Sequence, residues 1–270
     1  MKDFEFRVRG KSGVAVHEEL SRAFTGWKGD AERWLFVAPH DDDIVLGAGI
    51  LLQAAKAAGI PLRMLITTDG SMGYCTEEQK RTIKDVRAKE TKDSFDALDI
   101  PDVRWLNFPD CSLSRNGGRR PAQPGDPCVI EGYTGMQNAY TREIRDFAPT
   151  RLFVPSGCDY HPDHKMVYDE VMISVFHAGG DIWPELGAPI PATPTVYEMA
   201  IYADFPVKPN LMVKCSPEIL ERKLAAIGAY KSQLQIESLI NNVRESGPME
   251  LYREIEFSLY QPKTYLKDFE

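Results

Sequence analysis

Two short polar clusters contain most of the residues whose types could do chemistry. Residues 40–43 read HDDD and residues 161–164 read HPDH. Three of the five histidines in the chain lie in these two clusters. Ionisable side chains packed this closely are costly to leave unpaired away from water, and a bound cation would offset the repulsion between the carboxylates. The two clusters therefore suggest a metal site.

The donor types in both clusters suit zinc. Zinc binds imidazole nitrogen and carboxylate oxygen, and a catalytic zinc site keeps one position open for water. His40, Asp43 and His164 supply two imidazoles and one carboxylate. We therefore predict these three residues as the ligands of a zinc ion, although the same nitrogen and oxygen donors also bind iron or cobalt.

The other ionisable residues of the clusters could carry out the proton transfers of a hydrolysis. Asp42 could act as the general base toward water whose pKa zinc lowers to about 7. His161 could protonate a leaving amine or stabilise a tetrahedral oxyanion. Asp163 could hold a ring nitrogen of His161 and favour its protonated form.

Each cluster also has an ordinary structural explanation. Consecutive carboxylates often begin a helix because they complement its dipole, and a single histidine is more often a surface or core residue than a ligand. Short motifs of this kind also occur by chance. Two such clusters in one chain, each directly after a predicted strand, favour the chemical interpretation.

The elements that must position these clusters alternate between strand and helix. Short apolar runs predict strands at 33–39, 62–67, 103–106, 151–154 and 195–202. The segments between and after them predict helices at 44–58, 77–98, 136–147, 166–178 and 217–234. This order indicates an α/β fold with a mostly parallel sheet and helices on both faces. Ligands bind beyond the carboxyl ends of such strands, where both clusters lie.

Composition narrows the classes of function. The 270 residues carry a net charge of -8, which argues against a nucleic-acid partner. No stretch approaches the roughly 20 apolar residues of a membrane span, and residues 1–10 lack the apolar segment of a secretory signal. The five cysteines form no CxxC pair, so we expect reduced thiols in a cytoplasmic protein. The length fits one domain over 1–270, whose core we place at about 33–233.

At the two clusters the sequence resembles the PIG-L/LmbE-type deacetylases. The first motif of that family is a strand followed by (A/P)-H-P-D-D, and the second is H-P-D-H. Residues 39–43 read PHDDD, with Asp41 at the place of the usual proline, and the second motif is intact. The resemblance implies a Rossmann-like three-layer α/β sandwich. It also implies the same zinc ligands, general base and histidine partner that the residue types suggest.

Weaker matches extend the resemblance along the chain. Arg87 and Glu90 match an R-x-x-E helix pattern, Asp110 occupies a position that in relatives often contacts a sugar hydroxyl, and residues 223–233 match a K-x-x-A…SQ helix. The resemblance implies that Arg87 and Asp110 bind the substrate. The plainer alternatives are a solvated Arg87 paired with Glu90 and a turn-forming Asp110 after a proline.

Asp41 is the main departure from the family motif. A proline at this position would stiffen the loop, whereas an aspartate adds a negative charge beside the predicted metal. We expect Asp41 to face solvent at the start of the following helix rather than to act as a third carboxylate near the zinc.

Two segments fall outside the motifs. Residues 112–131 read as a loop with three arginines, which could meet an anionic group on a substrate or be solvated. Residues 181–210 are rich in proline and could shape the rim of the site or a contact in a homo-oligomer.

Together these features predict a zinc-dependent hydrolase that removes the acetyl group of an N-acetylated amino sugar, a small-molecule substrate. Three alternatives stay open: a metal-dependent amidase acting on another amide such as a thiol conjugate, a magnesium-dependent phosphate-handling protein, and a sugar-binding module without catalysis. Magnesium prefers oxygen ligands, so His40 and His164 count against the second. Intact Asp42 and His161 count against the third, because binding alone requires neither.

Overall fold

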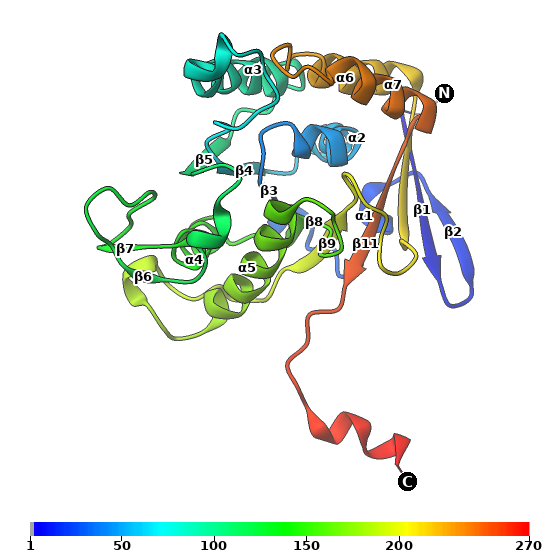
Figure 1. Ribbon diagram of the computed structural model, residues 1–270. Helices are drawn as coiled ribbons and strands as arrows, with labels where there is room; N and C mark the ends of the chain where they lie inside the picture. Colours follow the sequence, from blue (N-terminus) through cyan, green and yellow to red (C-terminus); the bar gives the residue numbers. More distant parts are fainter. Residues whose placement is uncertain (1–2, 270) are drawn as a thin grey trace.

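A single mixed sheet runs through the molecule (Figure 1). The computed structural model describes residues 3–269, and within them this sheet has nine strands. In spatial order they are β2 (Gly13–His17), β1 (Phe4–Gly10), β10 (Leu211–Cys215), β11 (Met249–Ile255), β9 (Thr195–Met199), β8 (Arg151–Pro155), β3 (Trp34–Ala38), β4 (Leu62–Thr68) and β5 (Val103–Phe108).

The strands of this sheet fall into a parallel and an antiparallel part. The strands β9, β8, β3, β4 and β5 pair in parallel with one another. β3 and β8 are buried along their whole length, as expected of parallel strands that are covered on both faces. β11, β10, β1 and β2 extend the sheet by antiparallel pairing. The predicted α/β fold with a parallel core is confirmed, and the antiparallel extension goes beyond the prediction.

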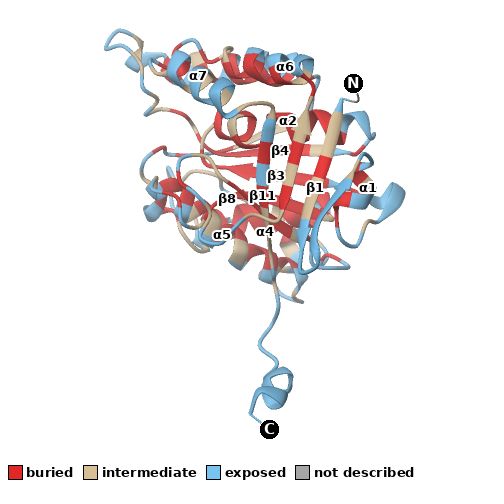
Figure 2. Cartoon of the chain, turned by 90° about the vertical axis from the view of Figure 1, so that its right-hand side faces the viewer, coloured by how far each residue is buried: buried red, intermediate tan, exposed pale blue. Residues whose placement is uncertain are grey.

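Helices cover both faces of the sheet (Figure 1). On one side lie α2 (Asp43–Ala57), α3 (Ile83–Ala97), α6 (Pro217–Ile227) and α7 (Ile236–Ser246), and on the other lie α4 (Met136–Phe147) and α5 (Pro162–Gly179). Side chains of β3 alternate between the two layers: Trp34 and Phe36 pack toward α2, whereas Leu35 and Val37 pack toward α4 and α5. Figure 2 shows the buried interior between exposed outer surfaces.

Further observations concern the bounds and character of the helices. A short helix, α1 (Leu20–Ala23), lies between β2 and β3. α5 begins at Pro162, four residues before the predicted start, because the ring of His161 caps it. α6 ends at Ile227, well before the predicted end at 234. Within the described chain, no helix combines the length and the apolar character that crossing a membrane requires.

Side chains from distant elements bind the backbone in the middle of α2. The buried carboxylate of Glu250, in β11, accepts hydrogen bonds from the backbone N–H groups of Ile50 (2.7 Å) and Leu51 (2.9 Å). In a regular helix these N–H groups donate to the carbonyls four residues earlier, at 46 and 47. Those two carbonyls accept from Nζ of Lys223 (2.7 Å) and the hydroxyl of Tyr252 (3.2 Å). The helix that follows the first polar cluster is thus tied through its own backbone to β11 and α6.

Gly49 allows this close approach. A Cβ at position 49 would lie 2.7 Å from Cγ of Lys223, which is closer than carbon atoms can approach. Lys223 in turn pairs with Glu250 at 2.7 Å, and both side chains are buried. The glycine in α2 therefore lowers the local helix propensity but admits the lysine that completes the buried network.

A second buried network joins β3 to β8. Glu32, just before β3, accepts hydrogen bonds from the backbone N–H of Lys28 (2.8 Å), Nε1 of Trp34 (2.8 Å) and the hydroxyl of Thr150 (2.6 Å). Its carboxylate also pairs with Nη2 of Arg151 at 2.9 Å, and both side chains are buried. This ion pair fixes the two strands after which the polar clusters emerge.

We expect Glu32→Gln to lower the free energy of unfolding by about 3 kcal/mol at neutral pH, because it leaves the buried Arg151 guanidinium without its counter-charge. Burial raises the pKa of Glu32, but hydrogen bonds from Thr150, Lys28 and Trp34 and the charge of Arg151 hold it below the ordinary value of 4.5. Because the folded pKa is depressed, the carboxylate stabilises the fold above that ordinary value, and the contribution is lost as the pH falls through the folded pKa.

Urea unfolding at a series of pH values measures this effect. The difference in unfolding free energy between the wild type and Glu32→Gln should be largest near neutral pH and should shrink below about pH 4.5. A difference that stays constant across this range would contradict the role of the Glu32 charge.

Candidate active site

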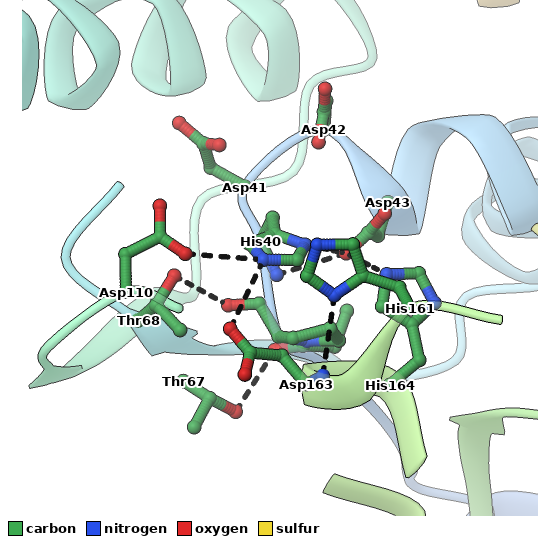
Figure 3. Close-up of polar contacts among 12 residues, drawn as sticks. His40, Asp41, Asp42, Asp43, Thr67, Thr68, Asp110, His161, Asp163 and His164 are labelled. Carbon is green, nitrogen blue, oxygen red and sulfur yellow. Dashed lines mark hydrogen bonds and ion pairs between the residues drawn. The ribbon is translucent and has the colours of Figure 1, made fainter. Parts of the chain in front are cut away.

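The two polar clusters meet beyond the carboxyl ends of β3 and β8. These strands are parallel neighbours, so the loops that follow them emerge at the same edge of the sheet. The ring centroids of His40 and His161 are 4.7 Å apart, and those of His161 and His164 are 5.2 Å apart. Figure 3 shows the His40 ring between carboxylates, with His161 and His164 beside it. The fold thus brings together residues that are more than a hundred positions apart in the chain.

The three predicted zinc ligands lie in direct contact. Oδ2 of Asp43 is 3.0 Å from Nδ1 of His40 and 3.3 Å from Nε2 of His164. Ligand atoms of a tetrahedral zinc site, each about 2.1 Å from the metal, lie about 3.4 Å apart. Within the described chain, Oδ1 of Asp43 and Nε2 of His164 are buried without an aligned hydrogen-bond partner, which a bound cation would explain. These residues therefore fit a zinc ion.

Two further sets of possible metal-ligand atoms lie around His40. The donor atoms of His40, His161 and His164 all lie within 4.8 Å of one another, and so do those of His40, Asp110 and Asp163. His40 belongs to both sets and His164 to the first, whereas neither set contains Asp43. The site therefore offers more donor atoms than the three predicted, and His161 lies within reach of a metal as well as of a substrate.

Charge in this cluster is balanced between carboxylates and imidazoles. Burial raises the pKa of Asp43, but the neighbouring His164 and His40 outweigh burial and hold it well below its ordinary value. Burial lowers the pKa of His164, yet Asp43 and Asp159 together raise it to about 9. Burial also lowers the pKa of His40, but the carboxylates of Asp43, Asp110 and Asp163 raise it well above its ordinary value. Without a metal, protonated rings neutralise the carboxylates, and a metal would displace those protons.

Asp42, the predicted general base, is the N-cap residue of α2 and is buried. Its Oδ2 accepts a hydrogen bond from Nε2 of Gln233 at 3.0 Å, and its Oδ1 lies 3.6 Å from Nη2 of Arg87. Burial raises the pKa of Asp42 to about 6, with Arg87 opposing the rise and the charge of Asp43 adding to it. A carboxylate with a pKa near neutrality is well suited to accept and release a proton.

His161 has contacts that differ from those predicted. Its Nδ1 accepts a hydrogen bond from the backbone N–H of Asp163 at 3.2 Å, so the neutral ring carries its proton on Nε2. The Asp163 carboxylate lies elsewhere: it accepts from the backbone N–H of Cys111 at 2.9 Å and is 3.6 Å from Nε2 of His40. Burial, together with the charges of His40 and His164, lowers the pKa of His161. The expected carboxylate contact that would favour a protonated His161 is absent because helix capping occupies Nδ1.

Asp41 is buried and paired, so the expectation of a solvent-facing residue is wrong. Nε of Arg87, in α3, donates to Oδ2 of Asp41 at 2.9 Å, Nη2 of Arg87 donates to its Oδ1, and the hydroxyl of Thr91 adds a bond of 3.0 Å. The paired guanidinium neutralises the carboxylate and makes its burial tolerable. The suggested pairing of Arg87 with Glu90 is also absent, because Glu90 accepts hydrogen bonds from Ser232.

Three contributors to the site lie outside the predicted set. Oδ2 of Asp159 is 3.1 Å from Nδ1 of His164, the place of a carboxylate that orients a metal-binding imidazole. The ring of Tyr202 lies 5.2 Å from that of His164, and Gln233 binds Asp42. Asp159 lies two residues before the second motif, and this closeness in the sequence could have identified it as part of the site. Gln233 ends the K-x-x-A…SQ pattern, which gave it no role at this site, and Tyr202 comes from a distant segment without a motif.

A cavity of about 630 Å³ opens at the site. Five predicted residues line it: His40, Asp42, Arg87, Asp110 and His161. The other three, Asp43, Asp163 and His164, are buried and do not line it. Pockets of this size hold small molecules such as a sugar. Of the predicted ligands, His40 lines the cavity and Asp43 and His164 lie beneath it, and the predicted base faces into it.

The loop at 112–131 does not bring its arginines to this cavity. It contains η3 (Leu113–Arg115) and β6 (Arg120–Pro121), which pairs with β7 (Tyr133–Thr134). The Arg119 guanidinium pairs with Glu185 and lies 4.7 Å from the centroid of the Trp183 ring. Arg120 pairs with Asp126 at 2.6 Å. None of the three arginines predicted in this loop is among the residues that line the cavity.

Comparison with known proteins agrees with these observations. The model of the PIG-L family, described as GlcNAc-PI de-N-acetylase, matches residues 35–175, slightly more than half of the chain. A probable N-acetyl-alpha-D-glucosaminyl L-malate deacetylase 2 of Bacillus cereus is 26% identical over 210 residues, which cover 74% of this chain and 83% of that protein. The diacetylchitobiose deacetylase of Thermococcus kodakarensis is 25% identical over 209 residues, covering 76% and 71% respectively.

A solved structure supports the fold. The N,N'-diacetylchitobiose deacetylase from Pyrococcus horikoshii superimposes with a TM-score of 0.68 at 23% sequence identity, covering 88% of this chain and 89% of that one. The stretch that matches the family model runs from β3 into α5 and contains both polar clusters. The chain therefore belongs to the PIG-L family.

Proposed function

We propose that this chain is a zinc-dependent N-deacetylase that hydrolyses the acetamide of an N-acetylated amino sugar, releasing acetate and a free amine. One observation carries the proposal: the buried Asp42 and the ring of His161 face a single cavity, beside the donor cluster of His40, Asp43 and His164. Membership of the PIG-L family, and two relatives named as deacetylases of N-acetylglucosamine compounds, support the choice of the acetyl group.

His40, Asp43 and His164 would hold the metal, with Asp159 orienting His164 from behind. When bound there, zinc would polarise the acetamide carbonyl and lower the pKa of water. The protein would contribute a fixed arrangement of ligands, because Asp43 and His164 lie in the first turns of α2 and α5.

Asp42 would take the proton of the attacking water. Gln233 donates to one of its carboxylate oxygens, which fixes the orientation of the base. The position at the start of α2 places Asp42 next to the ligand Asp43, so that base and metal ligand are set by the same turn of backbone. General-base catalysis of this kind contributes about 10²–10⁴-fold to a rate.

His161 would act on the acetamide group rather than on the attacking water. Because its Nδ1 is bound to the backbone N–H of Asp163, Nε2 is the atom that can donate to the developing oxyanion or deliver a proton to the leaving amine. Arg87 and Asp110 also line the cavity, and we retain both as contacts to the sugar, with Arg87 acting while it remains bound to Asp41.

The runner-up is an amidase that uses the same residues on a different acyl group. The products distinguish the two functions: acetate released from N-acetylglucosamine or its oligomers supports the deacetylase, and release only from bulkier amides supports the amidase. A magnesium-dependent phosphate site is disfavoured because two of the three predicted ligands are imidazoles, whereas magnesium prefers oxygen.

Metal removal tests the proposal. We expect the purified protein to contain about one zinc per chain and to lose acetate release after chelation, with activity restored by zinc. Asp43→Ala should weaken zinc affinity by more than about 100-fold, because it removes the carboxylate that contacts both imidazoles. Elemental analysis and competition with a chelator measure both effects.

The exposed Asp93, in α3, provides a matched control, since Asp93→Ala removes a carboxylate remote from the cluster and should leave the zinc content unchanged. Stoichiometric zinc without acetate from any amino sugar would move the function to another amide. Absence of tightly held divalent metal after reconstitution would overturn the hydrolase assignment.

A further inference from the structure

The mouth of the cavity is formed by apolar and aromatic side chains that remain exposed. Met72, Tyr74, Tyr160 and Tyr202 line the cavity, and 62%, 66%, 82% and 44% of their respective surfaces are exposed. They come from three separate loops, which follow β4, β8 and β9. Large exposed side chains gathered at one opening are typical of a binding surface rather than of ordinary solvent-facing loops.

Two of these tyrosines have free rings, and the backbone of one of them is held by hydrogen bonds. Within residues 3–269, the side chains of Tyr74 and Tyr160 have no ring contact and no hydrogen-bond partner. The backbone N–H of Tyr74 nevertheless donates to Oε1 of Gln233 at 3.2 Å, and its carbonyl accepts from Leu234 at 3.0 Å. A rigid aromatic side chain offers a large apolar contact at a small cost in conformational entropy. The entrance is therefore ready to contact a flat apolar group.

Charge in the cavity disfavours an anion. The lining includes the carboxylates of Asp42 and Asp110, and among the described lining residues Arg87 is the single lysine or arginine. The Arg87 guanidinium is bound by Asp41 and lies 3.6 Å from Asp42, so its charge is already balanced. Arg119 and Arg120 of the 112–131 loop pair with Glu185 and Asp126, and Arg115 does not line the cavity. An anionic group at the mouth would meet acidic side chains without a free lysine or arginine among the described residues that line the cavity, which costs affinity in a partly desolvated pocket.

Resting on the deacetylase function proposed above, we infer that the group attached to the amino sugar is neutral and presents a flat apolar face to Tyr74 and Tyr160. Two kinds of group share this chemistry: an aryl ring, and the apolar face of a second sugar ring. A conjugate that carries a carboxylate or a phosphate is disfavoured. The loop residues at the mouth thus select the substrate, while the clusters beneath carry out the reaction.

Acetate release from three substrates tests this inference: phenyl N-acetylglucosaminide, diacetylchitobiose and the malate conjugate of N-acetylglucosamine. We expect kcat/KM to be at least about tenfold higher for a neutral conjugate than for the malate conjugate at low salt, and the gap to narrow as added salt screens the charges. Comparison of kcat/KM for the aryl and disaccharide substrates shows which of the two neutral groups is preferred. A malate conjugate that is hydrolysed as fast as both neutral ones would overturn the inference.

Variants at the mouth test the residues themselves. Tyr160→Ala and Tyr74→Ala should each reduce the preference for the neutral conjugate over the malate conjugate by about fivefold through KM, because an aromatic contact is lost. Tyr160→Phe keeps the ring and should keep the preference. Tyr265→Ala serves as the control, since Tyr265 is an exposed tyrosine in η5 (Pro262–Asp268), on the C-terminal arm far from the site (Figure 1). An unchanged preference in both alanine variants would overturn the inference.

Binding to the His161→Asn variant, which keeps the carboxylates of Asp42 and Asp110, separates this inference from the proposed function. Calorimetry with the three unhydrolysed conjugates reports their affinities without any turnover. Tighter binding of a neutral conjugate supports the inference even if the wild type releases no acetate, and in that case the deacetylase function alone has failed. Equal or tighter binding of the malate conjugate overturns the inference even if acetate is released from all three substrates.

Discussion

Asp42→Asn should reduce acetate release by about 10²–10⁴-fold while zinc stays bound, because the amide cannot accept a proton. The side chain keeps its shape, and its remaining oxygen can still accept the hydrogen bond from Gln233 that Asp42 accepts at 3.0 Å. The substitution also removes one negative charge from a buried pocket, so the fold should lose little stability. The loss should therefore appear in kcat, measured as acetate formed under saturating substrate.

Two measurements make this result specific to the base. Elemental analysis should show the same zinc content in Asp42→Asn as in the wild type, which separates loss of the base from loss of the metal. Asp93→Asn makes the same chemical change on the exposed face of α3, where the carboxylate pairs only with surface lysine, and should retain full activity. Acetate release by Asp42→Asn within about tenfold of the wild type would show that another group takes the proton.

Arg87→Met should lower the free energy of unfolding by about 3–5 kcal/mol, because it leaves a buried carboxylate without its partner. Asp41 and Arg87 are both buried, and the guanidinium forms two hydrogen bonds to the Asp41 carboxylate. Arg87 also lies 3.6 Å from Asp42, so a second buried carboxylate loses a favourable charge. Urea denaturation of the metal-free proteins measures the change.

A double-mutant cycle isolates the pair. Asp41→Asn combined with Arg87→Met should cost less than the sum of the two single changes, because neither leaves an uncompensated charge once the other is made. Arg244→Met is the matched control: its side chain is half-exposed and 3.8 Å from Glu221, a surface contact worth about 0–1 kcal/mol. Strictly additive effects of the two buried substitutions would contradict the importance of the pair.

The sequence predicts the parallel core well because each of its strands is a local apolar run that needs no partner to be recognised. β3 reads WLFVA and β8 reads RLFVP, and both are buried throughout. The antiparallel part is harder to predict, since β1 and β11 mix charged and apolar residues and have distant partners. Phe4 pairs with Cys215, for example, and no local pattern reveals a partner about two hundred residues away.

The candidate site likewise combines residues that local sequence reveals with residues that it does not. The two clusters are visible in the sequence because ligand and base are neighbours in the chain, as Asp42 and Asp43 are. The side chains that set their environment are remote, and Gln233 reaches Asp42 across 191 positions. The expectation for Asp41 was wrong for the same reason. Its partner Arg87 lies 46 residues later in the chain, and the local sequence of Asp41 does not reveal that the two are paired.

The network that binds the middle of α2 joins residues that the ribosome synthesises at widely separated times. Ile50 donates to a carboxylate 200 residues further along the chain, at Glu250. At about 5–20 residues per second on the ribosome, roughly 10–40 s pass between the synthesis of these two residues. The helix that carries Asp43 therefore emerges long before the groups that complete its hydrogen bonding exist. Before Glu250 is added, the nascent chain already holds both polar clusters, yet the helix that positions the first of them awaits one of the last strands to be synthesised.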